Sequence, residues 1–297
     1  MFDFRYHALS LVAVLVALGL GLLLGVAIGD KELVSSAKED LVKDLRGDVR
    51  NANSRADELQ SELRRRDDFE GQAYPALVRD MLPGERIGLV FLGSSSSDVY
   101  DGVRKALQNT GAQLGFVGVV REPPDLGALA SRARGTRYET LDQDTDLLQP
   151  FAERVGKGLV SAGQLAKNER SALLSSFSGE LSGVDAVVVY RSPASRDSSS
   201  SSDPDTIGPL EQGLVAGMRD ANVPVAGVET TGTDPSQIGW FRDRGLPSVD
   251  NLDHVPGQAA LVFVLSGDAD GSYGEKTTAE GLLPRLVGSS ETTTTTP

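Results

Sequence analysis

The chain has 297 residues, of which 24% are charged, and its formal net charge at pH 7 is −13. A nucleic-acid-binding protein would show a cluster or stripe of basic residues, and this sequence has none. The chain contains no cysteine, which excludes disulfide bonds, thiolate metal sites and a cysteine nucleophile. Beyond the first seventy residues, roughly 220 remain, enough for a domain with a sizeable core.

The first element is an uncharged stretch of 21 residues from Ala8 to Ile28. A helix of about 20 apolar residues crosses the hydrocarbon core of a bilayer, so we expect a cytoplasmic tip and a transmembrane helix within residues 1–29. A buried core helix of this length would show a polar face. A cleaved signal peptide is the main alternative, because Gly25 and Ala27 resemble a cleavage site. The apolar stretch is, however, longer than the roughly 7–15 residues of a signal peptide.

Small residues recur at every fourth position of this helix, which would line them along one face and let a second helix approach closely. The alternative is that glycine is simply common in membrane helices. The predicted packing face consists of Ala13, Ala17, Gly21, Gly25 and Gly29. Arg5 precedes the helix and Asp30 follows it, so the positive-inside rule places the N-terminus in the cytoplasm. We therefore expect a single-pass protein of the cytoplasmic membrane with its globular domain outside the cytoplasm.

Residues 30–70 are highly charged and contain no proline, and their apolar residues alternate at spacings of three and four. This heptad pattern predicts a coiled-coil stalk, and hence a homodimer. The predicted seam is Val42, Leu45, Val49, Ala52, Ala56, Leu59 and Leu63. The alternative is a single amphipathic helix that packs back on the globular domain.

Residues 71–287 are predicted to form an α/β domain, with a hinge at 71–83 where Gly71 and Pro75 occur. Short apolar stretches alternate with segments of helical period, which predicts a mostly parallel sheet flanked by helices, a Rossmann-like arrangement of three layers. The expected strands are 86–93, 114–120, 185–191 and 223–229. The expected helices are 96–111, 147–160, 169–181, 207–222 and 257–266. The serine-rich segment 192–206 is expected to be a mobile loop, and the threonine tract 288–297 a disordered tail.

One turn of this domain is a weak candidate for an anion site. Gly93, Ser94 and Ser95 lie between the first expected strand and its helix, where backbone amides can hold an anion. The turn lacks the lysine of a P-loop and the glycine spacing of a dinucleotide-binding fingerprint. Serines at such a position more often cap the helix, and Asp98 would repel an anion.

The sequence offers no recognisable metal site or catalytic site. Copper prefers Cys, Met or His ligands, and the two histidines, His7 and His254, and three methionines are scattered without ligand spacing. Asp250 and Asp253 are among the acidic residues of expected turns, where such residues are usually solvated. His254 has no nucleophile paired with it by a motif. We therefore expect no cofactor, no metal ligands and no enzymatic activity.

The opening segment MFDFRYH, the Leu- and Gly-rich helix after it and the Gly29-Asp30 exit resemble the start of the actinobacterial copper transport protein B (MctB) family. The stretch Val249–Gly267, the motif Gly271–Gly274 and the pair Leu283-Pro284 resemble that family's C-terminal signature. The resemblance spans most of the chain.

The resemblance implies residence in the cell envelope and a role in copper homeostasis or transport. It also implies an alternative, because related members are linked to septal cell-wall control together with a second membrane protein. A scaffold of that kind would not handle copper directly. The family is not an established enzyme group, and it supplies no ligand set to place on this sequence.

Three hypotheses follow from the sequence. The first is an interaction protein that binds a partner through a domain held on a dimeric stalk. The second is direct copper handling, for which a cluster of Met, His or Cys would be expected. The third is an enzyme or sensor that uses the turn from Gly93 to Asp98.

Overall fold

The computed structural model of the chain describes residues 4–193 and 204–285. It consists of two compact units, Met1–Phe69 and Glu70–Pro297. The tail predicted at 288–297 and most of the loop predicted at 192–206 lie outside the described residues. The predicted end of that loop, at residue 206, was wrong, because helix α6 (Pro204–Arg219) already begins at Pro204.

The N-terminal unit is built from one helix, α1 (Phe4–Leu77), which has 74 residues. Its segment His7–Ala27 is long and apolar enough to cross a membrane, and it is the one such helical segment among the described residues. The packing-face residues from Ala13 to Gly25 are exposed on this single chain, and Gly29 belongs to the same helix. The seven seam residues also lie on α1 and are largely exposed; Leu59, for example, is 62% exposed. Pairing of two such helices stays a prediction.

The prediction of a hinge at 71–83 was wrong for the first part of that range, because α1 continues through Gly71 and Pro75 to Leu77. Pro75 has no amide hydrogen to donate to the carbonyl four residues earlier, which normally weakens a helix. Packing outweighs this cost: Tyr74 and Val78 are buried in the core of the domain, and the Tyr74 hydroxyl donates to the Ala106 carbonyl at 2.7 Å. The chain turns only after Leu77.

The second unit is built on a seven-stranded sheet with the order β3-β2-β1-β4-β5-β6-β7. Its strands are β1 (Arg86–Leu92), β2 (Gln113–Val120), β3 (Leu174–Gly179), β4 (Ala186–Arg191), β5 (Val225–Val228), β6 (Ser248–Val249) and β7 (Ser272–Tyr273). All neighbours are parallel except β2 and β3, which are antiparallel. The predicted α/β class and mostly parallel sheet are therefore confirmed.

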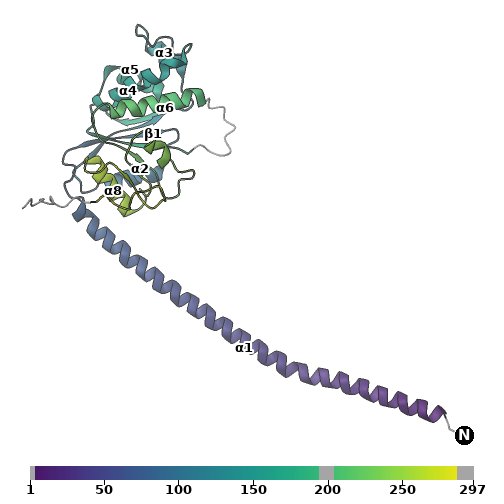
Figure 1. The fold of residues 1–297 in the computed structure, drawn as a ribbon. Helices are drawn as coiled ribbons and strands as arrows, with labels where there is room; N and C mark the ends of the chain where they lie inside the picture. Colours follow the sequence, from purple (N-terminus) through teal and green to yellow (C-terminus); the bar gives the residue numbers. More distant parts are fainter. Residues whose placement is uncertain (1–3, 194–203, 286–297) are drawn as a thin grey trace, which may run out of the picture. The chain divides into compact units, whose positions relative to one another are not determined.

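Helices cover both faces of the sheet (Figure 1). One face carries α3 (Leu126–Arg132), α4 (Leu148–Ser161), α5 (Gln164–Leu173), α6 and α7 (Ile238–Arg242), and the other carries α2 (Ser97–Ala106), α8 (Val255–Leu265) and the end of α1. Alternate residues of a strand point to opposite faces. In β1, Val90 and Leu92 accordingly join the first core, whereas Leu89 and Phe91 join the second.

The segment 169–181, expected to be one helix, was only partly helical. Helix α5 ends at Leu173, and the chain continues directly as strand β3. From Leu174 onward the residues are serines around a half-buried Phe177, whose ring stacks on Phe116 of β2 at 5.9 Å between centroids. Pairing with β2 and this ring contact explain the strand, which a helical reading of the sequence did not anticipate.

A charged residue lies inside the first core without a partner. Glu169 of α5 is fully buried, and neither of its carboxylate oxygens has a hydrogen-bond partner within the described residues. Burial raises its pKa to about 7, against the opposing effect of the charge on Arg132. The folded state therefore binds this proton more tightly than the unfolded state, in which the pKa of a glutamate carboxyl is near 4.5. The free energy of unfolding should consequently fall as the pH rises through that interval.

Replacing Glu169 with glutamine should raise the free energy of unfolding at pH 8 by about 1–3 kcal/mol, because the variant carries no charge to bury. At pH 5 the two proteins should differ little, because Glu169 is then protonated in the folded state. Urea unfolding followed by the fluorescence of Trp240, the single tryptophan of the chain, measures both values. Glu180→Gln, at an exposed position, is the matched control. An equal effect of Glu169→Gln at both pH values would contradict this account.

Candidate functional site

The carboxyl ends of the parallel strands meet along one edge of the sheet. From β1 the chain crosses to β2 on one side, whereas β4 adds on the other side of β1. The strand order therefore reverses between β1 and β4, which is where α/β sheets of this kind bind ligands. The residues that follow these strands are the candidate functional site.

The turn predicted as an anion site lies at this reversal point. Gly93 has a φ of +85°, a conformation that favours glycine. A Cβ atom on Gly93 would lie 2.7 Å from the carboxylate of Glu122, which follows β2. Ser94 and Ser95 are exposed, and the Ser96 side chain caps α2 by accepting from the Val99 amide at 3.3 Å. The nearby Glu122 carboxylate disfavours a bound anion, and the anion site stays a prediction.

Beside this turn, Arg191 ends β4 and holds two side chains from other elements. Its Nε donates to Glu211 of α6 at 2.9 Å, and its Nη1 donates to Gln237 at 2.5 Å. Two guanidinium groups lie over the Trp240 ring, that of Arg191 at 5.0 Å and that of Arg244 at 3.8 Å from its centroid. Burial raises the pKa of the Glu211 carboxyl, and the ion pair with Arg191 opposes this. The cluster thus combines one ion pair, Arg191–Glu211, with a second guanidinium, that of Arg244, over the same aromatic ring.

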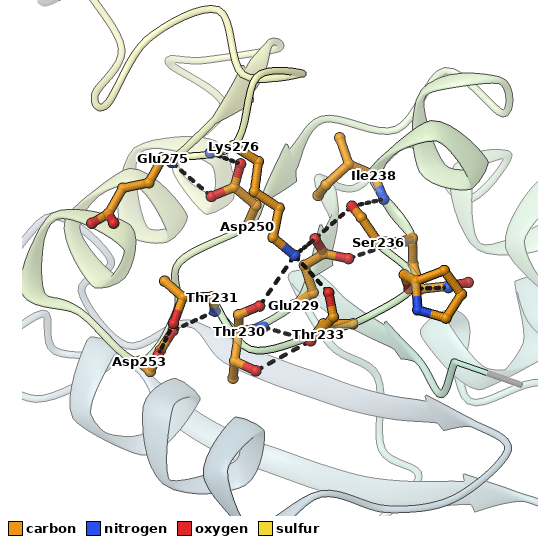
Figure 2. Close-up of polar contacts among 12 residues, drawn as sticks. Glu229, Thr230, Thr231, Thr233, Ser236, Ile238, Asp250, Asp253, Glu275 and Lys276 are labelled. Carbon is orange, nitrogen blue, oxygen red and sulfur yellow. Dashed lines mark hydrogen bonds and ion pairs between the residues drawn. The ribbon is translucent and has the colours of Figure 1, made fainter. Parts of the chain in front are cut away.

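Further along the edge, Glu229 follows β5 and is fully buried. Its carboxylate accepts from the Ser236 hydroxyl at 2.7 Å, from the Gln237 amide at 2.6 Å and from Lys276 Nζ at 2.5 Å. Lys276 Nζ also donates to the Thr233 carbonyl at 2.9 Å, as Figure 2 shows. The ion pair joins the end of β5 to the segment after β7, and both charges have several partners.

A second carboxylate holds the same segment. Asp250 follows β6, is 1% exposed, and accepts from the backbone amides of Glu275 and Lys276 at 2.7 and 3.0 Å. A Cβ atom on Gly274 would lie 1.9 Å from the Asp250 carboxylate. Only glycine fits there, and this explains the last residue of the motif Gly271–Gly274.

At the exposed end of the cluster, Asp253 accepts from the Thr231 amide at 2.9 Å and from its hydroxyl at 2.6 Å. Burial acts against the charged form of Asp253, but the bonds from Thr231 outweigh it and lower its pKa. His254 Nδ1 lies 2.9 Å from a carboxylate oxygen of Glu275, and this hydrogen bond raises the pKa of His254 against partial burial.

This geometry is that of a rigid polar network. Among residues 4–193 and 204–285, no group of three or more His, Cys, Asp or Glu side chains is arranged to hold a metal ion. Glu229, Asp250 and Asp253 are bound to amides, to hydroxyls or to Lys276 of the same chain, and these bonds hold the loops after β5, β6 and β7. No sequence pattern indicates the Glu229–Lys276 pair, because its members are 47 residues apart.

The sheet and its covering helices define an α/β protein. Its N-terminal apolar helix is typical of a membrane-associated protein. A protein-family model described as "Copper transport outer membrane protein, MctB" matches residues 1–284. The chain therefore belongs to the MctB family, as its N- and C-terminal motifs predicted. The family is related to transport and is not one of enzymes. No curated protein matches the chain.

Proposed function

We propose that the chain acts in copper transport or homeostasis of the cell envelope as an anchored, dimeric interaction protein. Residues 1–29 would anchor it in the cytoplasmic membrane, residues 30–70 would form the stalk, and residues 71–287 would form a partner-binding domain outside the cytoplasm. The observation that carries the copper role is the family match over residues 1–284.

The mode of action is inferred from the chain itself. The apolar segment His7–Ala27 continues, without a break in α1, into a charged segment with an exposed apolar seam. A single helix offers no polar lining for a pore. At the carboxyl edge, Glu229, Asp250 and Asp253 are bound to groups of the same chain, which favours a binding surface over catalysis. A second membrane protein of the envelope is the partner class that we propose.

Orientation and function can be tested in cells that make the chain. Because the chain has no cysteine, Ser131→Cys, on an exposed part of α3, gives a single label site. A membrane-impermeant maleimide should label this variant in intact cells as fully as in lysed cells. Labelling only after lysis would contradict the proposed orientation. Cells that lack the chain should differ in copper tolerance and copper content, and the wild-type chain should restore both.

A further inference from the structure

Four basic side chains surround helix α5. Lys167 and Arg170 belong to the helix and are exposed. Two backbone carbonyls of the same helix hold the others, because one accepts from Arg132 Nη1 at 3.3 Å and one from Arg121 Nε at 3.2 Å. Four positive charges are therefore gathered around one helix of 10 residues.

No acidic side chain balances this group. Within residues 4–193 and 204–285, none of the four cations forms an ion pair. The acidic residue of α5, Glu169, is fully buried and bonded to none of them, and Glu122, next to Arg121, lies against Gly93 instead. Gathered like charges repel one another, so a bound anion would stabilise this part of a chain whose net charge is −13.

Two of the arginines, Arg121 and Arg170, line a shallow hollow of about 350 Å³. The remaining lining residues are Leu174, Phe177 and three serines. The Arg170 guanidinium lies over the Phe177 ring, 4.8 Å from its centroid. Arginine and aromatic residues are both enriched at protein–protein interfaces. The hollow thus combines unpaired positive charge with a half-buried aromatic ring, which favours a protein segment as its occupant.

We infer that this hollow binds an acidic segment of the partner protein, with carboxylates of the segment paired to Arg121 and Arg170. A guanidinium group binds a carboxylate through two parallel hydrogen bonds, and an apolar side chain beside the carboxylate packs on Phe177. Helix α5 covers one face of the sheet and the end of α1 packs on the other, so the end of α1 does not cover the hollow. The inference rests on the proposed function for the existence of a protein partner, and adds where on the domain that partner binds.

Binding of two fluorescent peptides to the full chain in a neutral detergent tests this inference. One peptide alternates glutamate with leucine, and the other alternates glutamine with leucine. We expect the glutamate peptide to bind and the glutamine peptide to fail. Raising the salt concentration from about 0.1 M to about 1 M should weaken the binding, because the Debye length falls from about 10 Å to about 3 Å.

Charge reversal on α5 locates the site. Lys167→Glu plus Arg170→Glu reverses two exposed charges and should raise the dissociation constant at least about tenfold, equivalent to about 1.4 kcal/mol. Arg104→Glu plus Lys105→Glu makes the same change at exposed positions of α2, on the other face of the sheet, and should change the constant less than about twofold in about 0.15 M salt. If the reversal on α5 unfolds the domain, Arg170→Gln replaces it, with a rise of about threefold expected.

Two results would overturn the inference: a glutamate peptide that does not bind the wild-type chain, or equal binding by the α5 and α2 variants. Dextran sulfate that binds more tightly than the glutamate peptide at equal charge would also overturn it, by assigning the hollow to an anionic polysaccharide. These measurements need neither copper nor a dimer. Failure of the peptide to bind therefore leaves the proposed function in place, and that function is tested separately by copper tolerance.

Discussion

Replacing Lys276 with methionine should lower the free energy of unfolding of the domain by about 3–5 kcal/mol, because removal of one partner leaves a buried charge uncompensated. The Glu229 carboxylate is fully buried, and Lys276 is its cationic partner. Methionine keeps most of the length of the side chain, so the loss comes from charge and hydrogen bonding. Urea unfolding followed by Trp240 fluorescence measures the effect close to the site.

Two further variants make the Lys276 result specific. Lys105→Met removes an exposed lysine of α2 and should change the free energy of unfolding by less than about 0.5 kcal/mol. Glu229→Gln combined with Lys276→Met removes both charges and should recover part of the stability lost in Lys276→Met. If Lys276→Met is as stable as Lys105→Met, the ion pair does not hold the segment after β7 to the sheet.

Placing glutamate at both Leu59 and Leu63 should dissociate the proposed dimer of the full chain. In a paired stalk both leucines would be buried in each helix, and loss of one buried leucine costs about 2–5 kcal/mol. The dimer dissociation constant should therefore rise by at least about 100-fold. Mass measurement in detergent across a concentration series gives this constant.

The matched control for the stalk is Ser54→Glu plus Ser61→Glu. Both serines lie on the same helix, Ser54 exposed and Ser61 partly exposed, and in the heptad register they face away from the seam. This variant adds the same charge and should remain dimeric. A wild-type chain that is monomeric at all concentrations would contradict the seam, and equal dissociation by both variants would show that charge alone disrupts the dimer.

Local sequence patterns were sufficient to predict the central strands of the sheet and the turn after β1. Strands β1 and β4 are apolar in every position but their charged ends, and the sheet buries them on both faces. Ser96 and Gly93 mark the turn between β1 and α2, which the structure confirms. Helix α2 nevertheless ends at Ala106, five residues before Gly111, where the helix was expected to end.

Tertiary contacts decided the elements that the sequence did not predict. The short strands β6 and β7 have two residues each, too few for a periodic signal. They form because Asp250 binds the amides after β7 and because the Ser248 and Ser272 hydroxyls lie 3.0 Å apart. The same holds for the candidate site: Asp250 looked like a solvated turn residue, yet its carboxylate is buried against the loop that Gly274 begins.

The central claim is tested most directly by measuring the copper tolerance of three strains, each of which carries one version of the full chain. The versions are wild type, Leu59→Glu plus Leu63→Glu, and Ser54→Glu plus Ser61→Glu, in a strain that lacks its own copy and with equal membrane levels verified. We expect wild type and the serine variant to restore copper tolerance and the leucine variant to fail. Full restoration by a leucine variant shown to be monomeric would contradict the account of a copper-related protein that acts through a dimeric stalk.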